Sequence, residues 1–86
     1  MPEISRFFGI SIKMFYGDHA PPHFHARYAE YKGVIDIQAL IVIGGYLPPR
    51  VLGMVIEWAS QHQEELLDLW ERAANNQPLY KVSPLE

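Results

Sequence analysis

The residues best suited to chemistry lie in one short segment near the start of the chain. It reads Asp18-His19-Ala20-Pro21-Pro22-His23-Phe24-His25 and holds three of the four histidines. Histidine exchanges its proton near neutral pH, and its neutral ring is a common metal ligand. The segment therefore predicts one of three things: acid–base chemistry, a metal site, or a structural loop whose histidines form local hydrogen bonds.

Two alternating segments flank this loop and predict a β-hairpin. Residues 10–16 and 23–31 place apolar side chains at every second position, as in strands with one buried face. A turn near Lys32-Gly33 would end the second strand. If both apolar faces meet the same core, a one-residue slip is resisted and the opposite face is set by register. That face then carries the charged and titratable residues of both strands: Lys13, His23, His25 and Arg27.

This polar face predicts chemistry on phosphate. His23 and His25 would act as general base and general acid on RNA or another phosphate ester, and Arg27 would stabilise the charged transition state. The groups expected to hold the anion lie on the same face and at its rim: Lys13, Asp18, His19 and Asp36. Asp36 joins the set because Ile35 and Ile37 on either side of it are expected to face the core.

A divalent ion such as zinc is the other reading of the histidines. His19, His23 and His25 are three imidazoles, and zinc sites built from three histidines exist. Asp18 would be a fourth ligand or would orient one of the rings. The charges of Lys13 and Arg27 repel a dication, so the sequence predicts no resident metal and no cofactor.

The rest of the chain predicts a sheet followed by helix. Residues 4–8 can add a short strand before the hairpin, and the β-branched segments 34–37 and 40–43 predict two more. Apolar residues recur at helical spacing through 49–74, opened by two prolines. The polar stretch 60–65 within that segment predicts a kink or a break into two helices.

These elements predict one α+β domain spanning residues 1–86. The strands lie within 4–46 and form a three- to four-stranded antiparallel sheet. The helical segment 49–74 covers one face of the sheet. A tail at 77–86 follows and could add a short strand.

Composition excludes several classes of function. The chain of 86 residues has no cysteine, so it has neither disulfides nor thiolate metal sites. Its net charge of −3, from 7 basic and 10 acidic residues, argues against general DNA binding, which relies on many basic contacts. The N-terminus does not resemble a signal peptide, and the longest apolar run, 39–43, is too short to span a bilayer. We expect a cytoplasmic protein without membrane contact.

The apolar content predicts association. Hydrophobic residues make up 49% of the chain, which is generous for a domain with so thin a core. Apolar surface left exposed usually meets a partner. We therefore expect a homodimer or a complex with a small protein.

The segment from Asp18 to Ala26 resembles the signature of a small bacterial family, domain of unknown function 4160. The segments 1–10, 47–50 and 57–59 are similar to further motifs of that family. Its members are often encoded beside another short protein, in a layout similar to toxin–antitoxin pairs. The resemblance brings no established activity, and it implies a toxin–antitoxin-like component. A non-catalytic domain that binds a protein, metal or other ligand is the alternative, and whether the chain is an enzyme stays open.

Overall fold

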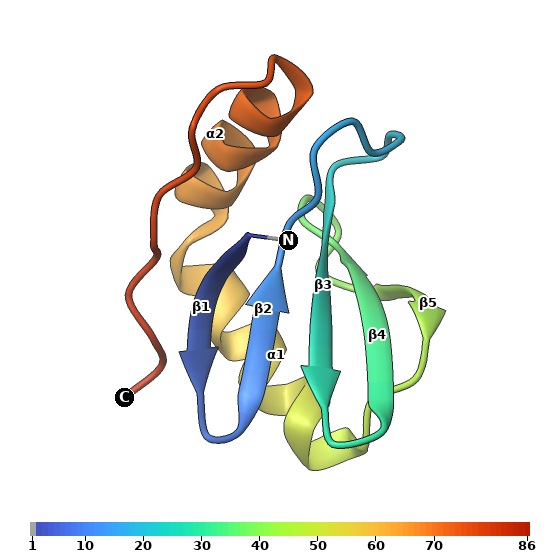
Figure 1. The fold of residues 1–86 in the computed structure, drawn as a ribbon. Helices are drawn as coiled ribbons and strands as arrows, with labels where there is room; N and C mark the ends of the chain where they lie inside the picture. Colours follow the sequence, from blue (N-terminus) through green and yellow to red (C-terminus); the bar gives the residue numbers. More distant parts are fainter. Residues whose placement is uncertain (1) are drawn as a thin grey trace.

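The computed structural model describes residues 2–86, which form five β-strands followed by two α-helices (Figure 1). The elements in chain order are β1 (Glu3–Phe7), β2 (Ile10–Lys13), β3 (His23–Tyr28), β4 (Tyr31–Asp36), β5 (Val42–Gly45), α1 (Pro49–Gln61) and α2 (Gln63–Ala74). The strands form one antiparallel sheet in the order β1-β2-β3-β4-β5, so each strand pairs with its neighbour in the sequence. The predicted α+β class with an antiparallel sheet is confirmed.

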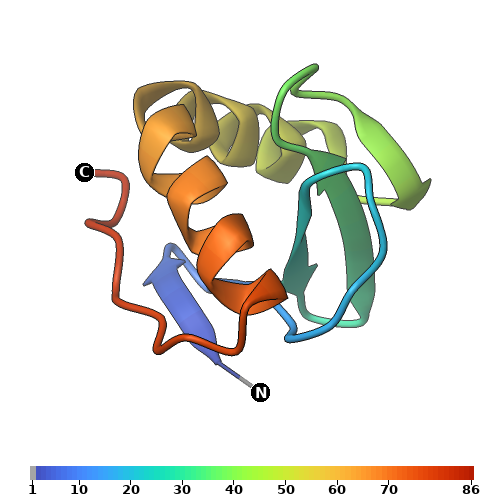
Figure 2. The same ribbon diagram turned by 90° about the horizontal axis from the view of Figure 1, so that it is seen from above.

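One face of the sheet packs against the helices and forms the core. Ile12 of β2 and Phe24 of β3 are fully buried on that face, as is Trp58 of α1. The ring of Trp58 lies between two sheet residues, with its centroid 5.4 Å from that of Phe7 and 5.7 Å from that of Phe24. Figure 2 shows both helices on the same side of the sheet. The apolar alternation in β2 and β3 therefore sets which face is left for polar residues.

The helical segment predicted at 49–74 is broken into two helices. A break was one of the two predicted alternatives, and a kink was the other. α1 ends at Gln61 and α2 begins at Gln63, with His62 between them at φ −132° and ψ 24°. His62 Nδ1 lies 2.6 Å from Glu65 Oε1, which holds the start of α2. The break gives each helix its own direction across the twisted sheet.

The sheet has five strands, not the three or four predicted. Residues 3–7 form a full strand that pairs with β2, and Ile4 and Phe7 bury their side chains in the core. β5 begins at Val42, two residues later than the segment 40–43 suggested. The delay has a local cause, because the chain turns first through Leu40, whose φ is 56°.

The turn between β3 and β4 lies at residues 29–30 and not near Lys32-Gly33. Ala29 adopts a φ of 53°, and this two-residue loop joins the strands directly. Gly33 is a strand residue for a packing reason. A Cβ at that position would lie 2.8 Å from Leu47 Cγ, so glycine permits the chain after β5 to pass close by.

The tail beyond α2 returns along β1 without becoming a strand. The Val82 N–H donates to Ile4 O at 2.7 Å, and the Trp58 indole N–H donates to Ser83 O at 2.8 Å. Figure 1 shows the tail beside β1, at the edge of the sheet. Neither helix within residues 2–86 is long and apolar enough to cross a membrane. The cytoplasmic location stays a prediction.

Trp58 is the side chain whose loss should damage the fold most. We expect Trp58→Ala to lower the free energy of unfolding by about 3–5 kcal/mol, because it leaves a large cavity and removes the hydrogen bond from the indole N–H to Ser83 O. Gly53→Ala on the exposed side of α1 is the matched control, since a Cβ there meets no atom within 4 Å. It should raise stability by about 1 kcal/mol. Urea unfolding measures both, and an equal effect of the two substitutions would contradict the packing described.

Candidate functional site

The face of the sheet opposite the helices is open in the part of the chain that the structure describes. The register of β2 with β3 pairs Lys13 with His25 and Ser11 with Arg27, and the register of β3 with β4 pairs Arg27 with Lys32. Side chains of paired residues stand on the same face about 5 Å apart. The predicted placement of Lys13, His25 and Arg27 on one polar face therefore agrees with the structure.

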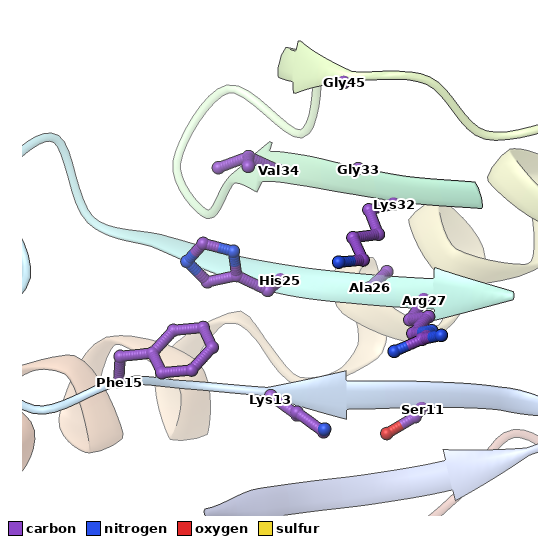
Figure 3. A pocket seen from close by; sticks show the side chains of 10 residues that line it. All are labelled: Ser11, Lys13, Phe15, His25, Ala26, Arg27, Lys32, Gly33, Val34 and Gly45. Carbon is purple, nitrogen blue, oxygen red and sulfur yellow. The ribbon is translucent and has the colours of Figure 1, made fainter. Parts of the chain in front are cut away.

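A hollow of about 320 Å³ lies in the middle of this open face (Figure 3). Three strands and the start of the loop after β2 contribute the side chains that point into it. Its lining residues are Ser11, Lys13, Phe15, His25, Ala26, Arg27, Lys32, Gly33, Val34 and Gly45. Figure 3 shows Phe15 and His25 together at one end and Arg27 toward the other, with the amino groups of Lys13 and Lys32 between them.

The hollow is basic although the whole chain is acidic. Lys13, Arg27 and Lys32 line it, and Arg6 borders an adjoining hollow of about 260 Å³ that shares Lys13 and Arg27. These are four of the chain's 7 lysines and arginines. Arg6 is paired with the carboxylate of Glu3 at 2.8 Å. None of the ion pairs within residues 2–86 involves Lys13, Arg27 or Lys32, so their charge is available to an anion.

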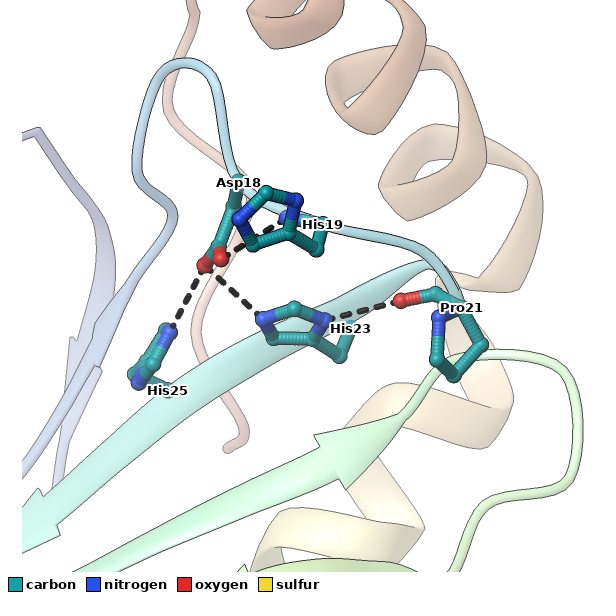
Figure 4. Close-up of polar contacts among 5 residues, drawn as sticks. All are labelled: Asp18, His19, Pro21, His23 and His25. Atoms are coloured by element: carbon teal, nitrogen blue, oxygen red, sulfur yellow. Dashed lines mark hydrogen bonds and ion pairs between the residues drawn. The ribbon is translucent and has the colours of Figure 1, made fainter.

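A compact polar cluster adjoins the hollow through His25, which belongs to both (Figure 4). Oδ2 of Asp18 lies 2.8 Å from His23 Nε2 and 3.2 Å from His25 Nε2. The other carboxylate oxygen accepts the His19 backbone N–H at 2.9 Å. Asp18, His23 and His25 thus offer three ligand atoms within 4.8 Å of one another. They are the residues of this site that could hold a metal ion.

Aromatic neighbours fix both rings of the cluster. His23 is 8% exposed and lies between Trp70 of α2, 5.0 Å away between ring centroids, and His25, 5.2 Å away. The rings of His25 and Phe15 are nearly perpendicular, with their centroids 4.4 Å apart. Because each ring is held by packing as well as by Asp18, the cluster is pre-organised.

The two histidines differ in what their nitrogens can do. His23 Nδ1–H donates to the Pro21 carbonyl at 2.8 Å, and its Nε2 faces Asp18, so both nitrogens are engaged. His25 engages only Nε2, and its Nδ1 has no hydrogen-bond partner within residues 2–86. Of the two rings, only His25 is placed to exchange a proton with a molecule in the hollow.

Asp18 is held as a carboxylate. Burial raises the pKa of Asp18, but hydrogen bonds from the His19 backbone N–H and from the rings of His25 and His23, with the charge of His23, together lower the pKa below its ordinary value. An ionised Asp18 accepts hydrogen bonds and cannot donate them. It can therefore fix the position of His25 or bind a cation.

His19 and Asp36 lie apart from the hollow. The His19 side chain is exposed, and only its backbone N–H reaches Asp18. Asp36 is on the open face, as expected, but its carboxylate accepts the backbone N–H groups of residues 38–39 at 2.8 Å each and closes the turn before β5. Their predicted part in anion binding stays a prediction.

Lys32 is the member of the site that the sequence prediction missed. The cause is the misplaced turn. A residue that is assigned to a turn is not assigned to either face of the sheet. Counting period two from Tyr31, directly after the turn at 29–30, places Lys32 and Val34 on the polar face. The signal was present in the sequence, since Val34 is followed by alternating Ile35 and Asp36.

Asp18 should make the stability of the chain depend on pH. Its folded pKa lies below its unfolded value, so its stabilising effect is present above the unfolded pKa and is lost as pH falls through the folded pKa. We expect the wild-type chain to be more stable than Asp18→Asn near pH 7, and the difference to shrink below about pH 4. Urea midpoints of both chains across this range measure it. A difference independent of pH would show that the carboxylate charge plays no part.

Comparison with known proteins gives one finding. The family described as domain of unknown function (DUF4160) matches residues 9–71. The matched range contains β2, the loop cluster, the residues that line the hollow, and Trp70. No curated protein and no solved structure matches the chain.

Proposed function

The chain belongs to the DUF4160 family of domains of unknown function, and we propose that it binds RNA or another phosphate ester on its open sheet face. The observation that supports this most is the convergence of Lys13, Arg27 and Lys32 on one uncovered hollow. The proposed setting, a toxin–antitoxin-like pair, rests on the gene layout that the family resemblance implies.

The hollow has the chemistry that a phosphate requires. The Arg27 Nε–H donates to the Ala29 carbonyl at 3.2 Å, which leaves the two terminal amino groups of the guanidinium as donors for phosphate oxygens. The two lysines add compact positive charge. Phe15 and Val34 give the same hollow apolar walls, against which a base or another flat group can pack. Cations beside an aromatic ring favour a nucleotide over a bare phosphate ion.

If the bound ester is RNA, His25 is the group we propose as catalytic. Its Nδ1 would take the proton of the 2′-hydroxyl as the 2′-oxygen attacks phosphorus. The bond from phosphorus to the 5′-oxygen then breaks, and the leaving oxygen takes a proton from solvent. Asp18 holds His25 through Nε2, and Arg27 faces the charge that develops on the phosphoryl oxygens.

His23 supports this site rather than serving as a second catalytic histidine. Both of its nitrogens are engaged, and its ring is buried against Trp70. It holds Asp18, which in turn holds His25. This arrangement supports the His25 and Arg27 parts of the predicted chemistry better than the part that was assigned to His23.

RNA binding should depend on the three cations of the hollow. We expect Lys13→Ala, Arg27→Ala and Lys32→Ala each to weaken binding of a short single-stranded RNA. Each should also reduce the slope of log affinity against log salt by roughly 0.7, because one phosphate contact is lost. Arg50→Ala, which removes an exposed charge from α1, is the matched control and should leave both unchanged. Fluorescence anisotropy measures affinity across a salt series.

Cleavage is tested with the same chains. His25→Ala should retain RNA binding and lose cleavage, together with any growth arrest that expression of the chain causes. Cleavage that persists in His25→Ala would overturn the catalytic part of the proposal. RNA affinity that falls equally in Arg50→Ala and Lys32→Ala, or that is absent from the wild-type chain, would overturn the binding part.

The free edge of β5 favours a second function, association with another chain. The β1 edge is covered by the tail, whereas β5 lies at the opposite edge with no strand beside it within residues 2–86 (Figure 1). Ile41, Ile43 and Tyr46 on or beside β5 are 55%, 44% and 59% exposed. An exposed edge flanked by apolar side chains is suited to strand pairing. We propose a homodimer in which two copies of β5 pair.

The association is tested on the isolated chain. Light scattering should give the mass of a dimer for the wild-type chain and of a monomer for Ile43→Lys, because a charge on an edge strand opposes pairing. Phe8→Asn is the matched control, since it removes a side chain that is 61% exposed from the β1–β2 turn, far from β5 in the sheet order. A monomeric wild-type chain would contradict the dimer, as would loss of the dimer in Phe8→Asn.

A further inference from the structure

The contacts of His23 with Pro21 and Asp18 require a positive charge between the His23 ring and the Asp18 carboxylate. His23 Nδ1 points at a carbonyl oxygen, which only accepts, so its proton sits on Nδ1. In the neutral ring, Nε2 is then a lone pair, and it lies 2.8 Å from an oxygen of an ionised carboxylate. Two lone pairs at this distance repel unless something positive lies between them.

A third potential ligand atom faces the same oxygen. His25 Nε2 lies 3.2 Å from Asp18 Oδ2, so three potential ligands converge on one point. Protons on the two Nε2 atoms would bridge them to Asp18 one pair at a time and would leave the His23 ring charged, whereas one metal ion can bind all three atoms at once. From this convergence we propose that Asp18, His23 and His25 form a binding site for a divalent transition-metal ion.

The distances suit such an ion. Metal bonds of about 2.0–2.2 Å at tetrahedral or octahedral angles separate neighbouring ligand atoms by about 2.9–3.5 Å. The two separations from Asp18 Oδ2, 2.8 and 3.2 Å, are within a few tenths of an ångström of that range, and all three ligand atoms lie within 4.8 Å of one another. Two imidazoles with one carboxylate are a donor set used for zinc and for iron(II).

The surroundings also resemble those of a metal site. The Pro21 carbonyl binds the far nitrogen of His23, and a backbone carbonyl in that place is what fixes the ring of a metal-bound histidine. The His19 backbone N–H does the same for the second oxygen of Asp18. Trp70 and Phe15 wall the cluster with apolar surface, which strengthens electrostatic attraction inside it.

The cations of the hollow do not oppose the ion as strongly as their sequence positions suggest. Figure 3 shows the amino group of Lys13 and the guanidinium of Arg27 farther along the hollow than Phe15 and His25. Asp18 and His23 do not line the hollow. The carboxylate of Asp18 is the charge nearest to the proposed ion. An ion held by His25 Nε2 would leave the ring proton on Nδ1, so the metal-bound chain differs from the metal-free form in which His25 Nδ1 is the proposed base.

The structure also changes which histidines belong to the site. The sequence alone pairs His19 with His23 and His25, but the His19 side chain is exposed and lies outside the group of converging atoms. Asp18 takes the place of His19. The exchange supplies a sharp control, because His19 and His25 are the same residue type and lie only six positions apart.

The test is a calorimetric titration of the intact chain with zinc near neutral pH, without RNA. The wild-type chain should bind one zinc ion at micromolar concentration. Affinity should fall by at least about tenfold in His25→Ala and in Asp18→Asn, and should change by less than about twofold in His19→Ala. Because His23 is buried, His23→Ala can lose its fold, so the His25 and Asp18 variants carry the test. Circular dichroism confirms that each is folded.

A second readout reports the geometry of the ligands. Cobalt(II) in place of zinc should give visible absorption from nitrogen and oxygen coordination in the wild-type chain and in His19→Ala, and not in His25→Ala. Absence of zinc binding at micromolar concentration would overturn the site and leave protons to bridge the cluster. Equal loss of affinity in His19→Ala and His25→Ala would overturn it also. RNA binding plays no part in this titration, so failure here leaves the proposed function to its own test.

Discussion

The contact between Phe24 and Trp58 is the constraint on which the rest of the structure depends. Phe24 is the first apolar residue of β3, and its burial under α1 decides which side of that strand faces the core. In a strand, that one decision places both neighbours, His23 and His25, on the opposite side. A slip of one residue would bury charged groups and expose Phe24, at a cost of several kcal/mol. The fold and the site are therefore set by the same packing.

The loop before β3 depends on this packing in turn. His23 lies at the very start of β3, close enough to the helix layer for its ring to contact Trp70 while Nε2 reaches Asp18. Asp18 thereby links the loop to a strand whose position is already fixed. This explains how a loop with one glycine and two adjacent prolines becomes ordered without a hydrophobic core of its own, because its one carboxylate accepts three hydrogen bonds.

Periodicity explains what could be predicted from the sequence. The alternation around β2 and β3 was long enough to place Lys13, His25 and Arg27 on one face, and the apolar spacing of α1 and α2 was long enough to predict helix. Short segments gave weaker signals. The two-residue turn at 29–30 contains neither glycine nor proline, so Lys32-Gly33 looked more like a turn than the true position did.

The loop cluster could not be predicted, because the residues of a loop do not alternate between two faces in a regular pattern. Whether His19 or Asp18 turns toward β3 depends on backbone angles within a loop, and the spacing of histidines says nothing about them. Side-chain length and hydrogen bonding decide it here: the carboxylate of Asp18 reaches both rings, while the His19 backbone N–H is needed to hold that carboxylate. The same geometry made the carboxylate of Asp36 part of a turn.

The open face carries two kinds of electrostatic demand, and their arrangement is informative. At one end, potential ligand atoms of Asp18, His23 and His25 converge on one point, which suits a proton or a metal ion. At the other end, the positive charges of Lys13, Arg27 and Lys32 attract an anion. A face used only for flat protein contact has no need of this separation. A phosphate ester that spans the hollow satisfies the cationic end directly. Its oxygens, directed toward His25, would reach whatever proton or metal ion the other end holds.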